Sequence, residues 1–356
     1  PWQELRTALA ADKGLQQWAI ALDNSASYYE KIKPDTTFTF PNGSVTAPVM
    51  ARGCRELAAL ARSQTPEGLI QAVSSRFTLY RSTGTQGKLL VTGYYEPLLQ
   101  GSEKPSKRYR YPIYSRPADL AEGSDGNGKK IYGRKQGNKI LPYFSRHEID
   151  EEKKLSKKGL ELVWVDNRLD AFFLHVQGSG RVALPDGRTI RVGYDAPNGH
   201  PYKSIGSILV KEGQIPLEEI SMQTIRKWLV AHPKEQNRLL YANPSYVFFK
   251  LQQGGPFGNI NVPLTAFRSI ATDHRIFPKG VPGILTTELP RFQGKELQGW
   301  DKRTFWVVNQ DTGGAITGAG HVDLFTGFGE LAEETAGLMK QSGTLYLLAP
   351  LPPNPS

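Results

Sequence analysis

The residues best suited to chemistry lie in a glycine-rich stretch that runs from Asp311 to Asp323 (D-T-G-G-A-I-T-G-A-G-H-V-D). Its glycines permit sharp backbone turns and leave space beside the chain. Asp323 is followed by the apolar Leu324 and Phe325. A carboxyl group among apolar residues can have a raised pKa, remain protonated near neutral pH and act as a general acid. The plainer interpretation is that both aspartates are turn residues, because Asp favours turns beside Gly.

A third acid, Asp273, lies in the segment S-I-A-T-D-H-R. Taken alone, such a residue is typical of a salt bridge or a helix cap. Three carboxylates in one groove would mean more, because like charges raise the pKa of one member.

Two further segments combine polar and aromatic side chains. In Gly93-Tyr-Tyr-Glu-Pro97 the tyrosines could stack on sugar rings, or they could belong to an ordinary aromatic strand. Glu96 is a candidate second carboxylate, although the following proline indicates that it points to the surface. The turn Gln177-Gly-Ser-Gly180 resembles a substrate contact, whereas Gly-x-Gly alone is weak evidence for phosphate binding.

Covalent and metal chemistry find little support. No G-x-S-x-G nucleophile elbow is present, and Cys54 has no matched histidine nearby, so we expect it to be a small core residue. The six histidines show no metal-ligand spacing, and we expect neither a metal nor a cofactor.

The elements that must position these residues begin with helices over residues 1–90. Apolar residues at helical spacing indicate helices over 2–9, 15–22 and 65–79. The last of these begins with Thr65 as N-cap and Pro66 in the first turn. A strand follows over 89–95.

The middle of the chain is predicted to form a β meander over 160–194, with strands over 162–165 and 171–176. A tight turn is predicted at Pro185-Asp-Gly-Arg188, between strands over 181–184 and 189–192. Helices are predicted over 204–211 and 217–230. The last third is predicted to hold strands over 305–308 and 345–348 and a helix over 329–340. Two β-rich regions thus flank a middle segment that mixes loops, strands and helices. This arrangement favours one domain built from both ends of the chain, with a second domain inserted between them.

Composition limits the classes of protein. A chain of 356 residues with 36 Gly and 25 Pro predicts two domains, mainly β with α. A net charge of +10 favours polyanionic partners, of which nucleic acid and peptidoglycan are candidates. No zinc-ligand spacing or RNA-recognition signature supports nucleic acid. No apolar run could span a membrane, and the chain starts at Pro1, so we expect any export signal or anchor to precede it.

The chain resembles the membrane-bound lytic transglycosylase A family. The motifs that carry the resemblance lie in order from about residue 85 to the end: G-Y-Y-E-P at 93–97, V-Q-G-S-G at 176–180, N-G-H at 198–200, N-P-S-Y-V-F-F at 243–249 and the stretch 311–329. His175 stands where some relatives carry Asp, and we leave it out of the inferred site.

The resemblance implies a double-psi β-barrel with a module named for three aspartates, here Asp273, Asp311 and Asp323. The catalytic domain would comprise 1–100, with its helical N-terminal part, and 245–356. A smaller β-rich domain, 101–244, would be inserted and form the other wall of a glycan groove. The resemblance also implies a periplasmic enzyme, anchored to the outer membrane in its full-length form.

The implied reaction needs one carboxyl group. Asp323 would protonate the glycosidic oxygen between N-acetylmuramic acid and N-acetylglucosamine and then deprotonate the muramoyl 6-hydroxyl, giving a 1,6-anhydro sugar. Asp311 would orient it. The implied substrate contacts are Tyr94, Tyr95, Gln177, Gly178, Ser179, Tyr246, Asp273 and Gly314. The partners would be peptidoglycan strands and other cell-wall enzymes, not nucleic acid.

Three alternatives stay open. An inverting hydrolase on the same barrel would need a second carboxylate, from Asp311 or Asp273, to activate water. A non-catalytic cell-wall binding protein would need no acid at all. A nucleic-acid binder is suggested by the net charge alone.

Overall fold

The computed structural model describes residues 2–124, 130–137, 139–294, 296–314 and 316–350. The chain forms two compact units. The first unit combines the chain up to Tyr95 with the chain from Gly255 onward, and the second unit is Glu96–Gly254. The domain boundaries at 100/101 and 244/245, and the roles assigned to the two domains, stay a prediction.

The first unit begins with helices, as the apolar spacing predicts. The helix α4 starts after Thr65, whose hydroxyl accepts a hydrogen bond from the Gly68 backbone N–H at 3.2 Å. It ends at Arg76, earlier than predicted, because the chain turns into a strand at Phe77. The helices of this unit are α1 (Trp2–Ala10), α2 (Leu15–Lys31), α3 (Ala47–Ser63), α4 (Pro66–Arg76) and α10 (Glu330–Leu338). A hairpin of β1 (Thr37–Phe40) and β2 (Gly43–Thr46) joins α2 to α3.

The main sheet of the first unit has eight strands in the order β18-β4-β17-β14-β16-β15-β19-β3. They are β3 (Phe77–Arg81), β4 (Leu90–Glu96), β14 (Ser269–Ala271), β15 (Pro282–Gln293), β16 (Glu296–Asp311), β17 (His321–Phe328), β18 (Lys340–Ser342) and β19 (Thr344–Pro350). The short β14 pairs parallel with β16 and antiparallel with β17. Within the described residues no ladder joins the edge strands β18 and β3, so the closed double-psi barrel is not observed.

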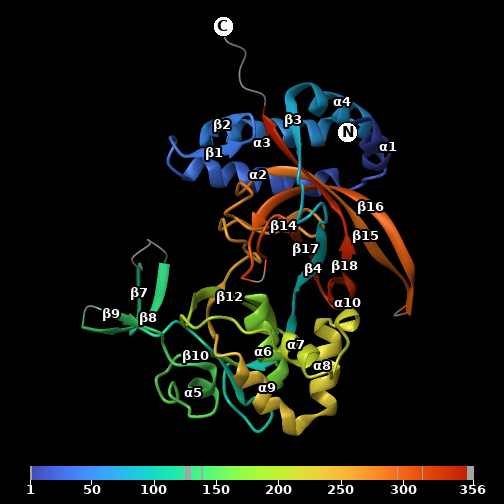
Figure 1. Ribbon diagram of the computed structural model, residues 1–356. Helices are drawn as coiled ribbons and strands as arrows, with labels where there is room; N and C mark the ends of the chain where they lie inside the picture. The colour runs from blue at the N-terminus through green and yellow to red at the C-terminus, as the bar shows by residue number, and fades with distance from the viewer. Residues whose placement is uncertain (1, 125–129, 138, 295, 315, 351–356) are drawn as a thin grey trace. The chain divides into compact units, whose positions relative to one another are not determined.

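The N-terminal helices hold the strand that carries Asp311. Trp18 of α2 stacks on Trp306 of β16, with ring centroids 4.6 Å apart. Its indole N–H donates to the Val307 carbonyl at 3.2 Å, and the Gln310 side chain donates to the Ala21 carbonyl at 2.7 Å. In Figure 1 α1 and α2 lie against β16. Cys54 on α3 is buried in the same core, as predicted.

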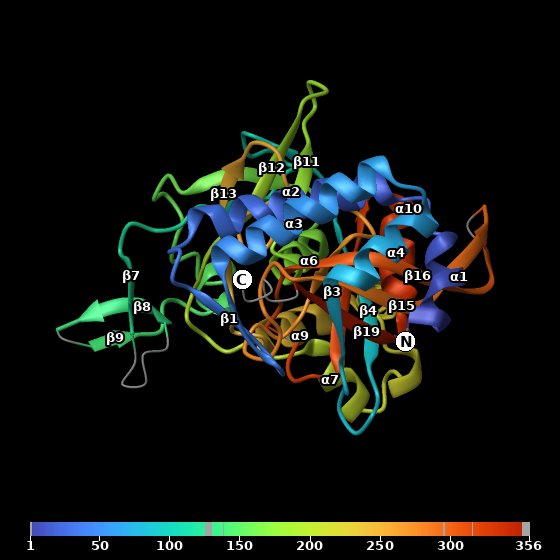
Figure 2. The same cartoon turned by 90° about the horizontal axis from the view of Figure 1, so that it is seen from above.

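The second unit contains a six-stranded sheet in the order β13-β12-β11-β5-β10-β6. Its strands are β5 (Leu98–Ser102), β6 (Tyr111–Tyr114), β10 (Glu161–Val165), β11 (Ser179–Ala183), β12 (Thr189–Pro197) and β13 (Val247–Gln252). A separate three-stranded sheet is formed by β7 (Leu120–Ser124), β8 (Lys130–Gln136) and β9 (Lys139–Leu141), seen apart from the larger one in Figure 2. The predicted turn between β11 and β12 is confirmed, with Gly187 at φ +85°.

One predicted strand of the second unit is wrong. Residues 171–176 belong to the helix α6 (Arg168–Gln177), because Asn167 caps its start and Gly178, at φ +80°, ends it. Leu169, Phe172 and Phe173 are buried at helical spacing. The other helices are α5 (Arg146–Asp150), α7 (Ile205–Lys211), η1 (Leu217–Glu219), α8 (Met222–Ala231), η2 (Pro233–Glu235) and α9 (Gln236–Ala242).

Candidate active site

Asp311 and Asp323 are brought to one place by the strand between them. Asp311 ends β16 and Asp323 lies in β17, and each is the register partner of Ala271 in β14. Strands in a sheet lie about 4.8 Å apart, so the two aspartate backbones are roughly 10 Å apart across β14. Two acids that are twelve residues apart in the chain therefore lie on either side of β14 in one sheet.

Asp323 is held by hydroxyl and imidazole groups. The Thr92 hydroxyl of β4 donates to Asp323 Oδ1 at 2.9 Å and lies 2.8 Å from His321 Nε2. Because the hydroxyl has one proton, its donation to Asp323 means that His321 donates to it. Burial raises the pKa of Asp323 to about 7, the hydrogen bond from Thr92 opposes this, and the charge of Asp311 adds to it.

Asp311 is held mainly by N–H groups. Its Oδ1 accepts from the backbone N–H groups of Asn259 and Thr312, each at 2.9 Å, and its Oδ2 accepts from the Tyr94 hydroxyl at 2.9 Å. Burial raises the pKa of Asp311 to about 6, against the effect of these donors. The same burial, with the two carboxyls nearby, raises the pKa of Tyr94 well above its usual value, so Tyr94 remains a donor.

The pair is suited to acid–base chemistry. Within the described parts of the chain, neither carboxyl has an ion-pair partner. Between pH 6 and 7 the more acidic Asp311 is mainly ionised and Asp323 mainly protonated, since their pKa values are about 6 and about 7. A buried acid whose pKa is raised to about 7, beside a second acid, can hold a proton near neutral pH and act as a general acid.

Asp273 has a different environment from the other two aspartates. It is 2% exposed and pairs with Arg275 at 2.6 Å, and its Oδ2 accepts from the Gly318 N–H at 2.8 Å. Hydrogen bonds from Arg275 and Gly318 hold the pKa of Asp273 well below its usual value. The salt-bridge interpretation is therefore confirmed. Asp273 anchors the loop before Asp323, while Gly314 lies in an exposed turn of that loop.

The two neighbouring tyrosines lie on opposite faces of β4. Tyr94 contacts Asp311, as described, whereas Tyr95 is 6% exposed and alternates to the other side of the strand. The prediction that Glu96 points to the surface is wrong: this side chain is 1% exposed and pairs with Arg181 at 2.7 Å and Arg191 at 3.1 Å.

The remaining predicted contacts belong to the second unit. Gln177 ends α6 and its amide contacts Met222, Gly178 is the left-handed C-cap, and Ser179 begins β11. Tyr246 is buried, and it lines a pocket with Arg146 and His175. Their role as glycan contacts stays a prediction.

Sequence reasoning missed Thr92. It lies two positions before the tyrosine that was singled out, on the same face of β4, and this alternation is the signal that could have identified it. His321 belonged to the motif but had no assigned role. In the described residues, no three His, Cys, Asp or Glu side chains form a group that could hold a metal ion.

Comparisons with known proteins assign the class of protein. The MltA specific insert domain matches residues 90–250 and the 3D domain matches residues 268–349. A membrane-bound lytic murein transglycosylase A from Vibrio cholerae is 32% identical over 266 residues, which is 74% of this chain and 66% of that protein.

Solved structures extend the similarity to the whole described fold. The membrane-bound lytic murein transglycosylase from Agrobacterium tumefaciens is 33% identical, with TM-score 0.77 and 96% of each chain covered. The structure of Escherichia coli MltA with bound chitohexaose is 26% identical, with TM-score 0.72, covering 96% of this chain and 91% of that one. The chain belongs to the membrane-bound lytic murein transglycosylase A family, and the predicted family and mainly β fold with helices are confirmed.

Proposed function

We propose that the chain is a peptidoglycan lytic transglycosylase in which Asp323 acts first as acid and then as base. The observation that carries this proposal is the Asp323 carboxyl, which burial and the neighbouring Asp311 keep protonated near neutral pH without any ion-pair partner among the described residues. The family of the chain supports the substrate class, because its relatives are named murein transglycosylases.

The reaction proceeds in two proton transfers. Asp323 gives its proton to the glycosidic oxygen between N-acetylmuramic acid and N-acetylglucosamine, and the bond from that oxygen to C1 of the muramoyl residue breaks. The resulting carboxylate then takes the proton of the muramoyl 6-hydroxyl as O6 bonds to C1. The products are a 1,6-anhydro end and a free N-acetylglucosamine end. No water is consumed, and Asp323 is protonated again.

The neighbours of Asp323 have distinct parts in this cycle. Thr92 occupies Oδ1, which leaves Oδ2 to carry the catalytic proton. Asp311, ionised above about pH 6, stabilises the positive charge that develops at C1. Tyr94 fixes Asp311 through its hydroxyl and is a candidate sugar contact. Asp273 fixes the backbone at Gly318, ahead of Asp323, by accepting its N–H.

The location of the reaction follows from its substrate. Peptidoglycan strands lie outside the cytoplasmic membrane, so the proposed place of action is the periplasm, with anchoring to the outer membrane as in a membrane-bound enzyme. No helix among the described residues is long and apolar enough to cross a membrane. A bound chitohexaose in the Escherichia coli relative supports glycan binding, and other cell-wall enzymes remain proposed partners.

Digestion of purified peptidoglycan by the wild type and by Asp323→Asn tests the proposal. The wild type should release muropeptides with anhydro ends, lighter by one water than hydrolysis products, and the variant should lose about a thousandfold or more in rate while remaining folded and able to bind glycan. Circular dichroism of both proteins is the control. Reducing-end products from the wild type would establish a hydrolase in place of a transglycosylase, and binding without turnover would establish a non-catalytic protein.

A further inference from the structure

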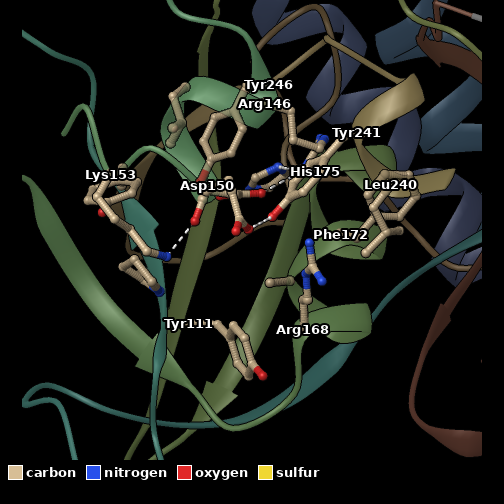
Figure 3. A pocket seen from close by; sticks show the side chains of 15 residues that line it. Tyr111, Arg146, Asp150, Lys153, Arg168, Phe172, His175, Leu240, Tyr241 and Tyr246 are labelled. Carbon is tan, nitrogen blue, oxygen red and sulfur yellow. Dashed lines mark hydrogen bonds and ion pairs between the residues drawn. The ribbon is translucent and has the colours of Figure 1, made fainter. Parts of the chain in front are cut away.

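A pocket lies within the second unit, lined by α5, α6, α9 and β6. Its volume is about 190 Å³, and for comparison a cavity of ~150 Å³ can hold benzene. The side chains labelled in Figure 3 include two arginines, a lysine, a histidine and one acid, together with aromatic rings. The proposed transglycosylase reaction makes no use of these charged groups.

The central base of the pocket is Arg146, which is 2% exposed. Its guanidinium Nη1 lies 3.0 Å from His175 Nδ1, and its Nη2 donates to the Ser245 carbonyl at 2.7 Å. The one carboxylate near it, Asp150, is 3.8 Å away, beyond hydrogen-bond length. A buried arginine is costly unless a charged acceptor compensates it. The pairing of Arg146 is therefore incomplete.

Three nitrogens of pocket-lining side chains are buried and lack a hydrogen-bond partner in the described structure: Nε of Arg146, Nε2 of His175 and Nη2 of Arg168. Buried polar groups in folded proteins are normally satisfied, so each such atom calls for an explanation. Arg168 adds a second guanidinium, whose Nη1 donates to the Asn237 side chain. In Figure 3 Arg168 and Tyr111 lie across the pocket from Arg146 and His175.

The charges that line the pocket are not balanced. Lys153 donates to the Asp150 backbone carbonyl, so its charge is not neutralised by a carboxylate there. Glu151, the second lining acid, is exposed and accepts from the Tyr241 hydroxyl at 2.7 Å. Burial raises the pKa of Asp150, which opposes its ionisation. In the interior of the pocket two arginines, Arg146 and Arg168, thus face one acid, whereas Lys153 and Glu151 are both exposed.

Aromatic rings form the remaining walls. The Arg146 guanidinium lies over the rings of Phe172 at 4.7 Å and Tyr246 at 5.1 Å, and the Arg168 guanidinium lies over Tyr241 at 4.9 Å. Rings that cover the guanidinium faces leave the N–H edges as the positions for an anionic acceptor. A planar carboxylate fits such an edge, because two of its oxygens can accept from one fork.

We propose that this pocket binds a carboxylate attached to a short peptide-like chain, as found on the stem peptides of peptidoglycan. The ligand carboxylate completes the pairing of the arginines, and the apolar part of one amino-acid residue fills the space between the rings. This assignment of the ligand source rests on the proposed function, whereas the carboxylate chemistry rests on the pocket itself. The pocket would therefore distinguish peptide-bearing strands from bare glycan.

Calorimetric titration of the full chain with the dipeptide L-alanyl-D-glutamate tests this inference. We expect saturable binding by the wild type, about tenfold weaker binding by Arg168→Gln, and about threefold weaker binding by Lys153→Gln. The matched control is Arg238→Gln, which removes an exposed arginine paired with Glu212 and Glu235 and should bind as the wild type does. Thermal melts of all variants verify that they are folded.

Two further ligands separate the possible sources. The fully amidated dipeptide should not bind, and succinate should bind at least about tenfold more weakly than the dipeptide. Equal binding of the amidated peptide would overturn the carboxylate assignment. Equal binding of succinate would overturn the stem-peptide source in favour of a small free acid. No binding of any probe, or equal binding by Arg168→Gln, would overturn the site.

Formation of anhydro products from purified, peptide-bearing peptidoglycan by the wild type is measured in parallel. Product without dipeptide binding would reject the pocket and retain the proposed function. Dipeptide binding without anhydro product would reject the proposed function and retain a carboxylate site.

Discussion

Asp323 in the first unit and Asp150 in the second are carboxyl groups whose pKa is raised by burial, yet the charges around them differ in sign. Asp323 has a hydroxyl donor and a second acid, Asp311, for neighbours. Asp150 lies near Arg146, Arg168 and Lys153, and each of these lowers its pKa.

This difference teaches that burial alone does not define a catalytic acid. A nearby acid adds to the effect of burial and keeps a proton available, whereas nearby bases oppose it and favour a counter-ion. Asp273 is the extreme example of a carboxyl beside a base, because Arg275 and the Gly318 N–H hold its pKa well below the usual value. Of the three aspartates that the family resemblance singled out, Asp273 is thus the least suited to proton transfer.

The largest effect is expected where a base is removed from beside Asp150. Arg146→Gln should lower the free energy of unfolding by about 3 kcal/mol, because the Ser245 carbonyl and His175 Nδ1 lose the buried donor that they share. Urea denaturation measures the change. Arg188→Gln, in an exposed pair with Asp186 and Glu103, should leave the free energy of unfolding nearly unchanged. Equal stabilities of the two variants would show that Arg146 does not stabilise the folded chain.

The second effect concerns pH and the first unit. The reaction needs protonated Asp323, whose pKa is about 7, so kcat/KM should fall about tenfold per pH unit above 7 and about 100-fold by pH 9. Because the folded pKa is raised from the ordinary value, the folded chain holds a proton that the unfolded chain releases. Stability should therefore fall as pH rises from about 4 to 7. Rates on purified glycan and melts across this range measure both, and a rate independent of pH up to 9 would contradict an acid of this pKa.

A smaller effect is expected from the donor to Asp323. Thr92→Val keeps the shape of the side chain but removes the hydroxyl that binds Oδ1. The loss of this bond should raise the pKa of Asp323 further, move the alkaline limb of the pH profile upward, and lower the rate about tenfold because the carboxyl is less well oriented. Thr92→Ser, which keeps the hydroxyl, should restore the pH profile and the rate. An unchanged profile would mean that Thr92 has a structural role only.

The smallest effect is expected at the partner acid. Tyr94→Phe removes the donor to Asp311 Oδ2, so the pKa of Asp311 should rise and its charge be present over less of the neutral range. We expect a loss of about threefold at pH 6.5 that diminishes by pH 7.5. A loss that did not vary with pH would assign Tyr94 to sugar contact alone.

Much of the site could be predicted from the sequence because it is local. Asp311, Asp323 and the glycines between them lie in one stretch, and the family resemblance assigned Asp323 its role. The Thr65 cap and the spacing of Leu69, Ile70 and Val73 likewise predicted α4, since capping and periodicity are properties of neighbouring residues.

The parts that could not be predicted depend on distant partners. Thr92 reaches Asp323 across 231 positions, and Glu96 is buried because Arg181 and Arg191 arrive from β11 and β12. The helix α6 was predicted as a strand since a short apolar run suits either element when its caps are overlooked. In this case the missed indication was the side chain of Asn167, which directly precedes the helix and caps its first turn.

The attachment of the N-terminal helices to β16 has a practical consequence. Asp12 accepts from both terminal nitrogens of the buried Arg268, each at 2.6 Å, and from the backbone N–H of Trp306. The matched family segments begin at residue 90. A fragment trimmed to them would lack Trp18 and so expose the Trp306 ring, and it would lack Asp12, the carboxylate that pairs with Arg268. We therefore expect a recombinant fragment that begins at residue 90 to fold poorly, because it lacks the helices that cover β16.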